Sequence, residues 1–161
     1  MQLDDFLRQC EKELSDEDQH ELRHLLAGND RVCVSKFAQE WFSFETAFRH
    51  HSAEVRAGRI GLDPRTAVPL YESGDSRVSR GVVNAFAKSN PLEREWTLDA
   101  TRWYVLDELV RQDPFGLSGV LSYALRLRLA YRWSNMNDDK GLRHLDQQLR
   151  ILLKAQPAEA W

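Results

Sequence analysis

Three residues near the N-terminus, His20, Glu21 and His24, have the spacing of a metal-binding catalytic motif, His-Glu-x-x-His. Residues four apart on a helix share a face, so both imidazoles could bind one zinc ion while the glutamate acts as general base. Glu40 or Glu45 could supply a third ligand. The pattern is therefore compatible with a zinc-dependent hydrolase that uses residues 20–24.

Features of the surrounding sequence weigh against zinc at this motif. The segment is short and polar, whereas the helix of a catalytic zinc site is normally buried. Arg23 places a cation beside the proposed dication, and no glycine-rich turn or third histidine follows the motif directly. We therefore expect a solvated helix face here, and the zinc hydrolase stays as an alternative function.

Other patterns that could indicate catalysis are weaker still. His50 and His51 are adjacent, so they point to different faces of a helix. Asp107 and Glu108 are adjacent too and diverge by about 100°, which makes a shared acid–base pair unfavourable. The sequence has neither a phosphate-binding loop nor a Gly-x-Ser-x-Gly elbow. We expect no enzyme, no catalytic residue, no cofactor and no bound metal.

Charged residues inside apolar stripes are more informative. Glu45 and Arg49 are four apart on one helix and can pair. Buried charges are tolerated only when they are paired. We therefore predict an ion pair between helices that joins Asp99 or Asp107 to an arginine among residues 126–132. Fold-specifying ion pairs are the favoured interpretation over a ligand site.

Composition places the chain among ordinary soluble domains. Its 161 residues form one predicted domain, 1–161, and the net charge of −3 (22 basic against 25 acidic residues) gives no nucleic-acid signal. Cys10 and Cys33 are too few for a disulfide framework and are expected to be small, half-buried apolar residues. The N-terminus lacks the pattern of a targeting signal, and no apolar run approaches the roughly 20 residues that cross a bilayer.

Hydrophobic periodicity predicts helices throughout, with no segment that alternates like a strand. Ser15, Ser35 and Asn90-Pro91 are start signals, and Gly28 is a stop signal. The expected helices span residues 3–14, Ser15 to Gly28, Ser35 to about 58–61, 78–88, 91–112, 117–133 and 138–154. Proline and glycine break the period at about 61–79, which predicts an irregular loop. The fold class is all-α, a compact antiparallel bundle of five to seven helices without a sheet.

Three helices have distinctive faces. In the third helix, the apolar residues that recur at helical spacing are Phe37, Trp41, Phe44, Phe48 and Val55. In the helix at 91–112 the predicted stripe consists of Leu92, Trp96, Trp103, Leu106 and Val110, with Asp99 on the same face. The last helix carries Leu142, Leu145, Leu149 and Leu152 on one face. The helix at 117–133 is too apolar to stand alone, so we expect it at the centre of the bundle.

Two blocks of this sequence resemble a known family. The first comprises Trp41-Phe42-Ser43-Phe44-Glu45, Arg49, Arg56-Ala57 and Gly61-Leu62-Asp63. The second runs from Leu98 through Arg102-Trp103-Tyr104-Val105-Leu106-Asp107-Glu108-Leu109 and Phe115 to Leu121-Ser122-Tyr123-Ala124-Leu125-Arg126-Leu127, Arg132-Trp133 and Asp139-Lys140-Gly141. Over roughly residues 3–154 the chain resembles the DUF2764 group, bacterial proteins found with V/A-type ATPase components and similar to the C/d subunit of these rotary enzymes.

The resemblance implies a non-catalytic part of that machine. The C/d subunit is an all-helical funnel that seats the central rotor shaft on the membrane ring and hydrolyses nothing itself. Carried over to this chain, the framework and partner-contact positions are Trp41, Glu45, Arg49, Arg56, Arg102, Asp107, Tyr123, Arg126 and Arg132.

We therefore expect an accessory or central-stalk component of a V/A-type ATPase, or else a generic helical adaptor. Its partners would be ATPase subunits of the central stalk or membrane ring, without nucleic acid and without direct insertion into the membrane. The expected location is cytoplasmic, peripheral to the membrane through a complex.

Overall fold

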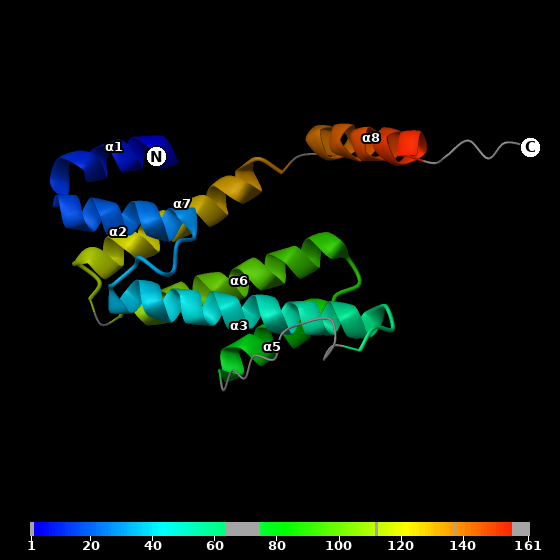
Figure 1. Cartoon of the computed structure of the whole chain (residues 1–161), viewed down its shortest axis with the longest axis horizontal. Helices are drawn as coiled ribbons and strands as arrows, with labels where there is room; N and C mark the ends of the chain where they lie inside the picture. Colours follow the sequence, from blue (N-terminus) through cyan, green and yellow to red (C-terminus); the bar gives the residue numbers. More distant parts are fainter. Residues whose placement is uncertain (1, 64–74, 112, 137, 156–161) are drawn as a thin grey trace, which may run out of the picture.

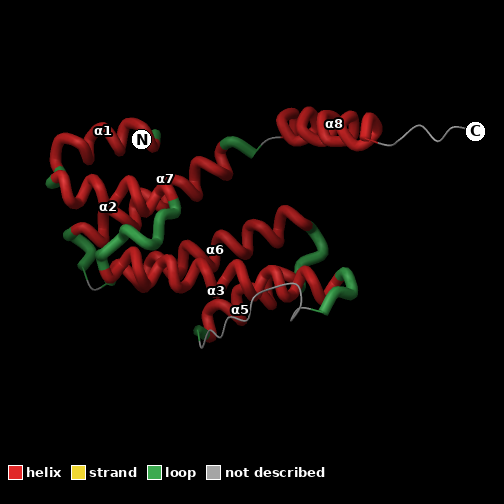
Figure 2. The backbone as a smooth tube through the Cα atoms, viewed as in Figure 1, coloured by secondary structure: helices red, strands yellow, loops and turns green. Residues whose placement is uncertain are grey.

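The computed structural model is an all-helical fold that agrees with the predicted class (Figures 1 and 2). It describes residues 2–63, 75–111, 113–136 and 138–155, and these contain helices and loops but no strand. The helices are α1 (Leu3–Glu13), α2 (Asp16–Ala27), α3 (Lys36–Arg59), α5 (Ser76–Phe86), α6 (Pro91–Val110), α7 (Leu117–Ser134) and α8 (Asp138–Ala155).

The predicted start and stop signals act as expected. The side chains of Ser15, Ser35 and Asn90 each accept a backbone N–H from the first turn of α2, α3 and α6, respectively. Pro91 occupies the first turn of α6, where its missing N–H costs nothing. Gly28 ends α2 with a φ of 78°, a left-handed conformation that glycine adopts without strain.

Helix α6 runs antiparallel to α3, α5 and α7, which pack against it. On α7, Arg126 pairs near the end of α6, with Asp107, while Arg132 pairs nearer its start, with Asp99. Helix α7 also contacts α1, α2 and α3, and its Leu121 and Ala124 are fully buried. The prediction of a central helix at residues 117–133 is therefore confirmed for the first part of α7, whereas most residues from 128 to 134 are exposed.

The loop between α2 and α3 is held by a buried carboxylate. Glu21 on α2 is 6% exposed, and its two oxygens accept the backbone N–H groups of Val34 (3.1 Å) and Ser35 (2.9 Å). Burial alone would raise the pKa of Glu21, but the hydrogen bonds from Ser35 and Val34 outweigh it and lower this pKa. The glutamate thus satisfies backbone donors just before α3 and fixes where that helix begins.

The two cysteines are both buried and both free. Burial, with the negative charges of Glu21 and Asp30 nearby, raises the pKa of Cys33 to about 11. Its thiol is therefore protonated and poorly nucleophilic at neutral pH. Both cysteines are small apolar residues as expected, but they are buried in the core and not half-buried.

The predicted stripe of α6 is partly wrong. Leu106 is fully buried, but Trp96 is 63% exposed and Trp103 is 41% exposed. Leu92 is exposed as well, and the buried residues of α6 are Leu98, Asp99, Val105 and Leu106. The reason is electrostatic: the carboxylate of Asp99 has its cationic partners on the inner side of the helix, so the buried face is centred nearer Asp99 and the tryptophans lie at its edges.

Helix α8 departs from the predicted compact bundle. It follows α7 but lies away from the other helices (Figure 1), and the residues from 141 to 151 are all exposed. Leu142, Leu145 and Leu149 lie on one face as expected, whereas the side chain of Leu152 is outside the described residues. Of the predicted loop at 61–79, residues 64–74 are outside the described part, and Ser76 already begins α5.

Among the helices described, none has the combination of length and apolar composition that crossing a bilayer requires.

We predict that Glu21→Ala lowers the free energy of unfolding by about 2–3 kcal/mol, because two backbone donors lose a charged acceptor. The folded-state pKa of Glu21 is lowered, so its contribution is present above the unfolded-state pKa and disappears as pH falls through the folded-state value. Urea unfolding at neutral and acidic pH measures both effects. Glu17→Ala, at an exposed position of the same helix, is the control. Equal losses of unfolding free energy in the two variants would contradict the role of Glu21 in holding the loop between α2 and α3.

Gly81 of α5 lies against Thr101 of α6. A Cβ atom at this position would lie 2.4 Å from Cγ2 and 2.7 Å from Oγ1 of Thr101. We predict that Gly81→Ala destabilises the fold by about 1–3 kcal/mol through this clash, as measured by denaturant unfolding. Adding Thr101→Ala removes the two closest atoms and should recover most of the loss. A double variant no more stable than Gly81→Ala would argue against the contact.

Candidate functional site

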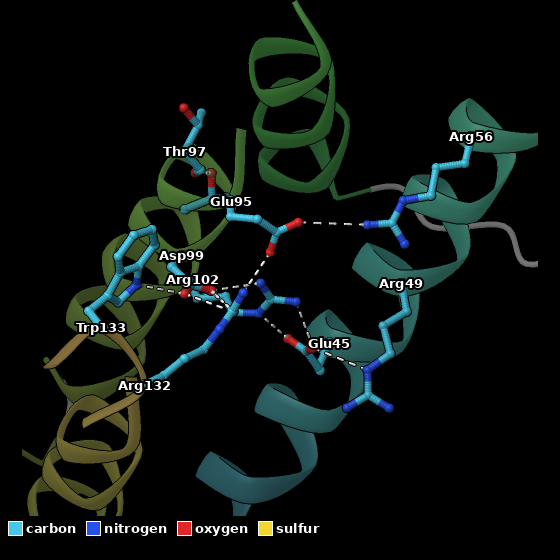
Figure 3. A network of polar contacts seen from close by, with 10 residues as sticks. Glu45, Arg49, Arg56, Glu95, Thr97, Asp99, Arg102, Arg132 and Trp133 are labelled. Atoms are coloured by element: carbon cyan, nitrogen blue, oxygen red, sulfur yellow. Dashed lines mark hydrogen bonds and ion pairs between the residues drawn. The ribbon is translucent and has the colours of Figure 1, made fainter. Parts of the chain in front are cut away.

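A buried network of ions joins the three long helices α3, α6 and α7 (Figure 3). Arg102 of α6 lies at its centre and donates to both carboxylate oxygens of Glu45 on α3, at 3.0 Å each. It also donates to Asp99 at 3.0 Å. Arg132 of α7 donates to the same Asp99 at 2.9 Å. Two acids and two arginines from three helices therefore neutralise one another in one place.

The network extends outward on both sides. Trp133 donates its indole N–H to Asp99 at 2.9 Å, which fixes the orientation of this ring. Glu95 accepts from Arg132 at 2.7 Å and lies 3.9 Å from Arg56 on α3. Arg49 donates to Glu45 at 3.1 Å, as the four-residue spacing predicted. Figure 3 shows these side chains converging from the three helices.

Burial makes the central charges interdependent. Asp99 is 6% exposed and Glu45 is 9% exposed, so each must remain paired. Burial alone would lower the pKa of Arg102, but the hydrogen bonds and charges of Glu45 and Asp99 outweigh it and raise this pKa. The Arg102 guanidinium also lies over the ring of Phe48, 4.8 Å from its centroid. Arg102 is therefore a permanent cation held from several sides.

A hollow of about 230 Å³ lies beside this network. Its charged lining comprises four arginines, at positions 49, 102, 128 and 132, against two carboxylates, Glu45 and Asp99. Its apolar walls include Trp41 and Phe42 of α3. Arg128 donates to the backbone oxygen of Leu26 at 2.8 Å, so it too is tethered. The hollow has an excess of positive charge and rigid guanidinium groups, and chemically it can accept carboxylates or other anions.

The structure brings most of the predicted site residues together. Of the nine framework and contact positions, six contribute to the network or its hollow: Trp41, Glu45, Arg49, Arg56, Arg102 and Arg132. The predicted pairing of Asp99 with an arginine among residues 126–132 is confirmed through Arg132.

The remaining three positions lie elsewhere. Asp107 pairs with Arg126 at 2.5 Å, and the Arg126 guanidinium lies 5.4 Å from the ring centroid of Trp103. The alternative of the same prediction, a pair between Asp107 and an arginine of α7, is therefore present as well. Tyr123 meets Phe6 of α1 edge to face, with 5.1 Å between ring centroids. Tyr123 thus helps to hold α1 against α7 and is not part of the charged hollow.

The residues of the His-Glu-x-x-His motif make contacts within the fold. His20 and His24 lie side by side, with 2.9 Å between their Nε2 atoms. The carboxylate of Glu21 accepts the backbone N–H groups of Val34 and Ser35 just before α3. Within the described residues, no group of three histidine, cysteine or acidic side chains is placed to hold a metal ion. The motif supplies a paired histidine face and a structural carboxylate.

Sequence reasoning missed several charged residues. Glu95 and Arg128 were not singled out, nor was the cluster in which Arg77 donates to Asp75 (2.7 Å) and Glu108 (2.9 Å), joining the start of α5 to the end of α6. The hydrogen bonds from Arg77 lower the pKa of both carboxyl groups. For Glu95 a signal existed: Glu95, Asp99 and Arg102 are spaced by four and three and so share one helical face.

We predict that Asp99→Asn lowers the free energy of unfolding by about 3 kcal/mol or more, because it leaves Arg102 and Arg132 short of a buried counter-charge. The matched control is Asp146→Asn on α8, where an exposed pair with Arg150 should contribute less than about 1 kcal/mol. Urea denaturation of both variants at neutral pH tests the difference. Equal effects would show that the network is not a structural determinant.

Comparison with known proteins agrees with the second block of the resemblance. A family described as "Protein of unknown function (DUF2764)" matches residues 77–152, just under half of the chain. The first block, on α3, lies outside the matched residues. No curated protein and no solved structure matches the chain. From α5 to α8, this chain is thus similar to DUF2764 proteins.

Proposed function

We propose that this protein is a non-catalytic accessory or central-stalk component of a V/A-type rotary ATPase, similar in role to the C/d subunit, and that it acts through protein–protein contacts. The choice of partner is supported by the resemblance of the two residue blocks to the DUF2764 group and, through it, to the C/d subunit. The mode of action is supported by the geometry of the charged hollow.

The observation that carries the proposal is the convergence of both blocks on one surface. Glu45 and Arg49 belong to the first block, and Arg102 and Arg132 belong to the second. These residues, far apart in sequence, form one network beside one hollow. The residues that carry the resemblance to the DUF2764 group would then include a partner-contact surface as well as helix-packing positions.

The chemistry of the hollow suits an acidic segment of another protein of the complex. Arg102 and Arg132 are already neutralised by carboxylates, so they act as rigid walls. Arg49 is 70% exposed, and Arg128 is also exposed, so both can accept further carboxylates at the rim. Because Arg128 is tethered to Leu26 and Arg49 to Glu45, less side-chain entropy is lost on binding than for free arginines.

The ion network also suits a part that must keep its shape while it bears on other subunits. Asp99 and Glu45 tie α6 to α7 and α3 through arginines, and each broken link would leave a buried charge unpaired. A seat for a shaft or a membrane ring needs such stiffness across helices. The protein would then be peripheral to the membrane and held there by the ring or stalk.

The experiment that tests the partner is affinity purification of the full chain from native membranes, followed by mass spectrometry. We expect V/A-type ATPase subunits of the stalk or membrane ring among the stoichiometric partners. Recovery of a reproducible partner set without any ATPase subunit would contradict the proposal and favour the generic helical adaptor.

The same purification tests whether the rim of the charged hollow contacts the partner. We predict that Arg49→Glu combined with Arg128→Glu weakens partner recovery at least tenfold and reduces its salt dependence, because two rim cations are replaced by anions. Arg8→Glu on the exposed face of α1 is the matched charge reversal and should leave recovery unchanged. Circular dichroism checks that the variants stay folded. Equal recovery with all three proteins would place the contact elsewhere.

A further inference from the structure

The two histidines of the His-Glu-x-x-His motif, which we call the histidine pair, lie at the surface of α2. His20 is exposed and His24 is half-buried, so both rings can be reached from solvent. Their Nε2 atoms are 2.9 Å apart, whereas their ring centroids are 4.1 Å apart. The two rings therefore converge toward their Nε2 atoms.

This geometry differs from that of a straight hydrogen bond between two imidazole rings. A linear N–H···N bond of this length would place the centroids about 5.2 Å apart, because each centroid lies roughly 1.1 Å behind its nitrogen. Two nitrogens that bind one metal ion at about 2.1 Å and at a right angle are about 2.9 Å apart, with centroids about 4.5 Å apart. The separations in the histidine pair, 2.9 Å and 4.1 Å, are nearer to the arrangement around a shared ion.

The distance between the two nitrogens also selects the kind of metal ion. A tetrahedral zinc ion would hold two histidine nitrogens roughly 3.4 Å apart. Square-planar or tetragonal coordination, which copper(II) and nickel(II) prefer, places adjacent ligands at right angles. Imidazole suits both of these ions, and copper(II) binds most tightly in the divalent series. The histidine pair therefore fits copper(II) or nickel(II) better than zinc.

Asn29 can fix the ring of His24 for this purpose. Its side-chain amide lies 3.3 Å from Nδ1 of His24, beside the turn that ends α2. A rotation of the amide by 180° exchanges its nitrogen and its oxygen. With the oxygen toward His24, Nδ1 carries the ring proton and donates it, which leaves the lone pair of Nε2 for a metal ion. Such a contact at the second ring nitrogen is usual for histidines that bind metals.

The features that weigh against a catalytic zinc site do not exclude this simpler one. The Arg23 guanidinium donates to Glu11 at 3.4 Å and to Gln19 at 3.2 Å, so a carboxylate partly balances its charge. Glu21 holds backbone N–H groups and is not available as a general base. In the part of the chain that the structure describes, no third histidine, cysteine or acidic side chain completes a metal site with the pair. Water would therefore fill the remaining coordination positions.

We propose that His20 and His24 form a two-histidine chelate that binds one copper(II) or nickel(II) ion at the surface of α2 without catalysing a reaction. Each imidazole supplies its Nε2 atom. Because the two ligands meet only when α2 is helical, the ion binds the folded chain more tightly than the unfolded chain and stabilises it. This inference concerns metal binding and does not depend on the ATPase partner proposed above.

The first test is isothermal titration calorimetry of the full chain with copper(II) chloride, at neutral pH in a buffer that does not bind copper. His20→Ala and His24→Ala should each weaken the tightest site roughly tenfold or more, because a single imidazole cannot chelate. His144→Ala removes an exposed histidine of α8 and is the matched control, which should bind as the wild type does. Circular dichroism checks that the variants stay folded. Unchanged copper binding by both α2 variants would overturn the proposal.

The second test needs no substitution. Electron paramagnetic resonance of the wild-type chain with one equivalent of copper(II) should show a tetragonal site with two imidazole nitrogens. A spectrum with one imidazole nitrogen, or with none, would overturn the chelate. Parallel titrations with nickel(II) and zinc(II) chloride test the right angle, and we expect nickel to bind more tightly than zinc. Tighter binding of zinc would overturn the assignment of a right-angle site.

Discussion

The carboxylate of Asp99 is the constraint on which the packing of the long helices depends. It is buried, and it accepts from Arg102 of its own helix, Arg132 of α7 and the indole of Trp133. A buried carboxylate cannot be left with fewer partners without a cost of several kcal/mol, so α6 must lie with this face toward α7 and α3. The edge positions of Trp96 and Trp103 follow from that orientation.

That orientation also places the two candidate surfaces. On one side of Asp99 the arginines of α3, α6 and α7 line a charged hollow. Asp99 also belongs to the lining of an apolar groove between α6 and α7, together with Trp96, Trp103 and Trp133. Asp99 and Leu129 therefore line both a charged hollow and an apolar groove.

Local signals in the sequence were sufficient for the helices, while the packing of those helices was only partly predictable. Caps at Ser15, Ser35 and Asn90 and the stop at Gly28 depend on neighbouring residues alone, so the ends of helices could be placed within a few residues. Apolar spacing in α6 suggested the tryptophans as core residues, because large aromatic rings usually bury well. A partner on another helix decides which face turns inward, and spacing within α6 does not contain that information.

In the candidate site, too, local contacts could be predicted from the sequence and contacts between helices only in part. The pairs Glu45–Arg49 and Asp99–Arg132 could be anticipated from four-residue spacing and from the rule that buried charges are paired. The link from Arg102 to Glu45 joins residues 57 apart and could not be predicted from spacing.

The most direct measurement of the functional account is a cryo-electron microscopy map of the native V/A-type ATPase from cells that express this chain. The account predicts density for the chain, with its arginine hollow against an acidic segment of a neighbouring protein in the complex. A map in which every stalk and ring position is filled by other proteins would contradict it.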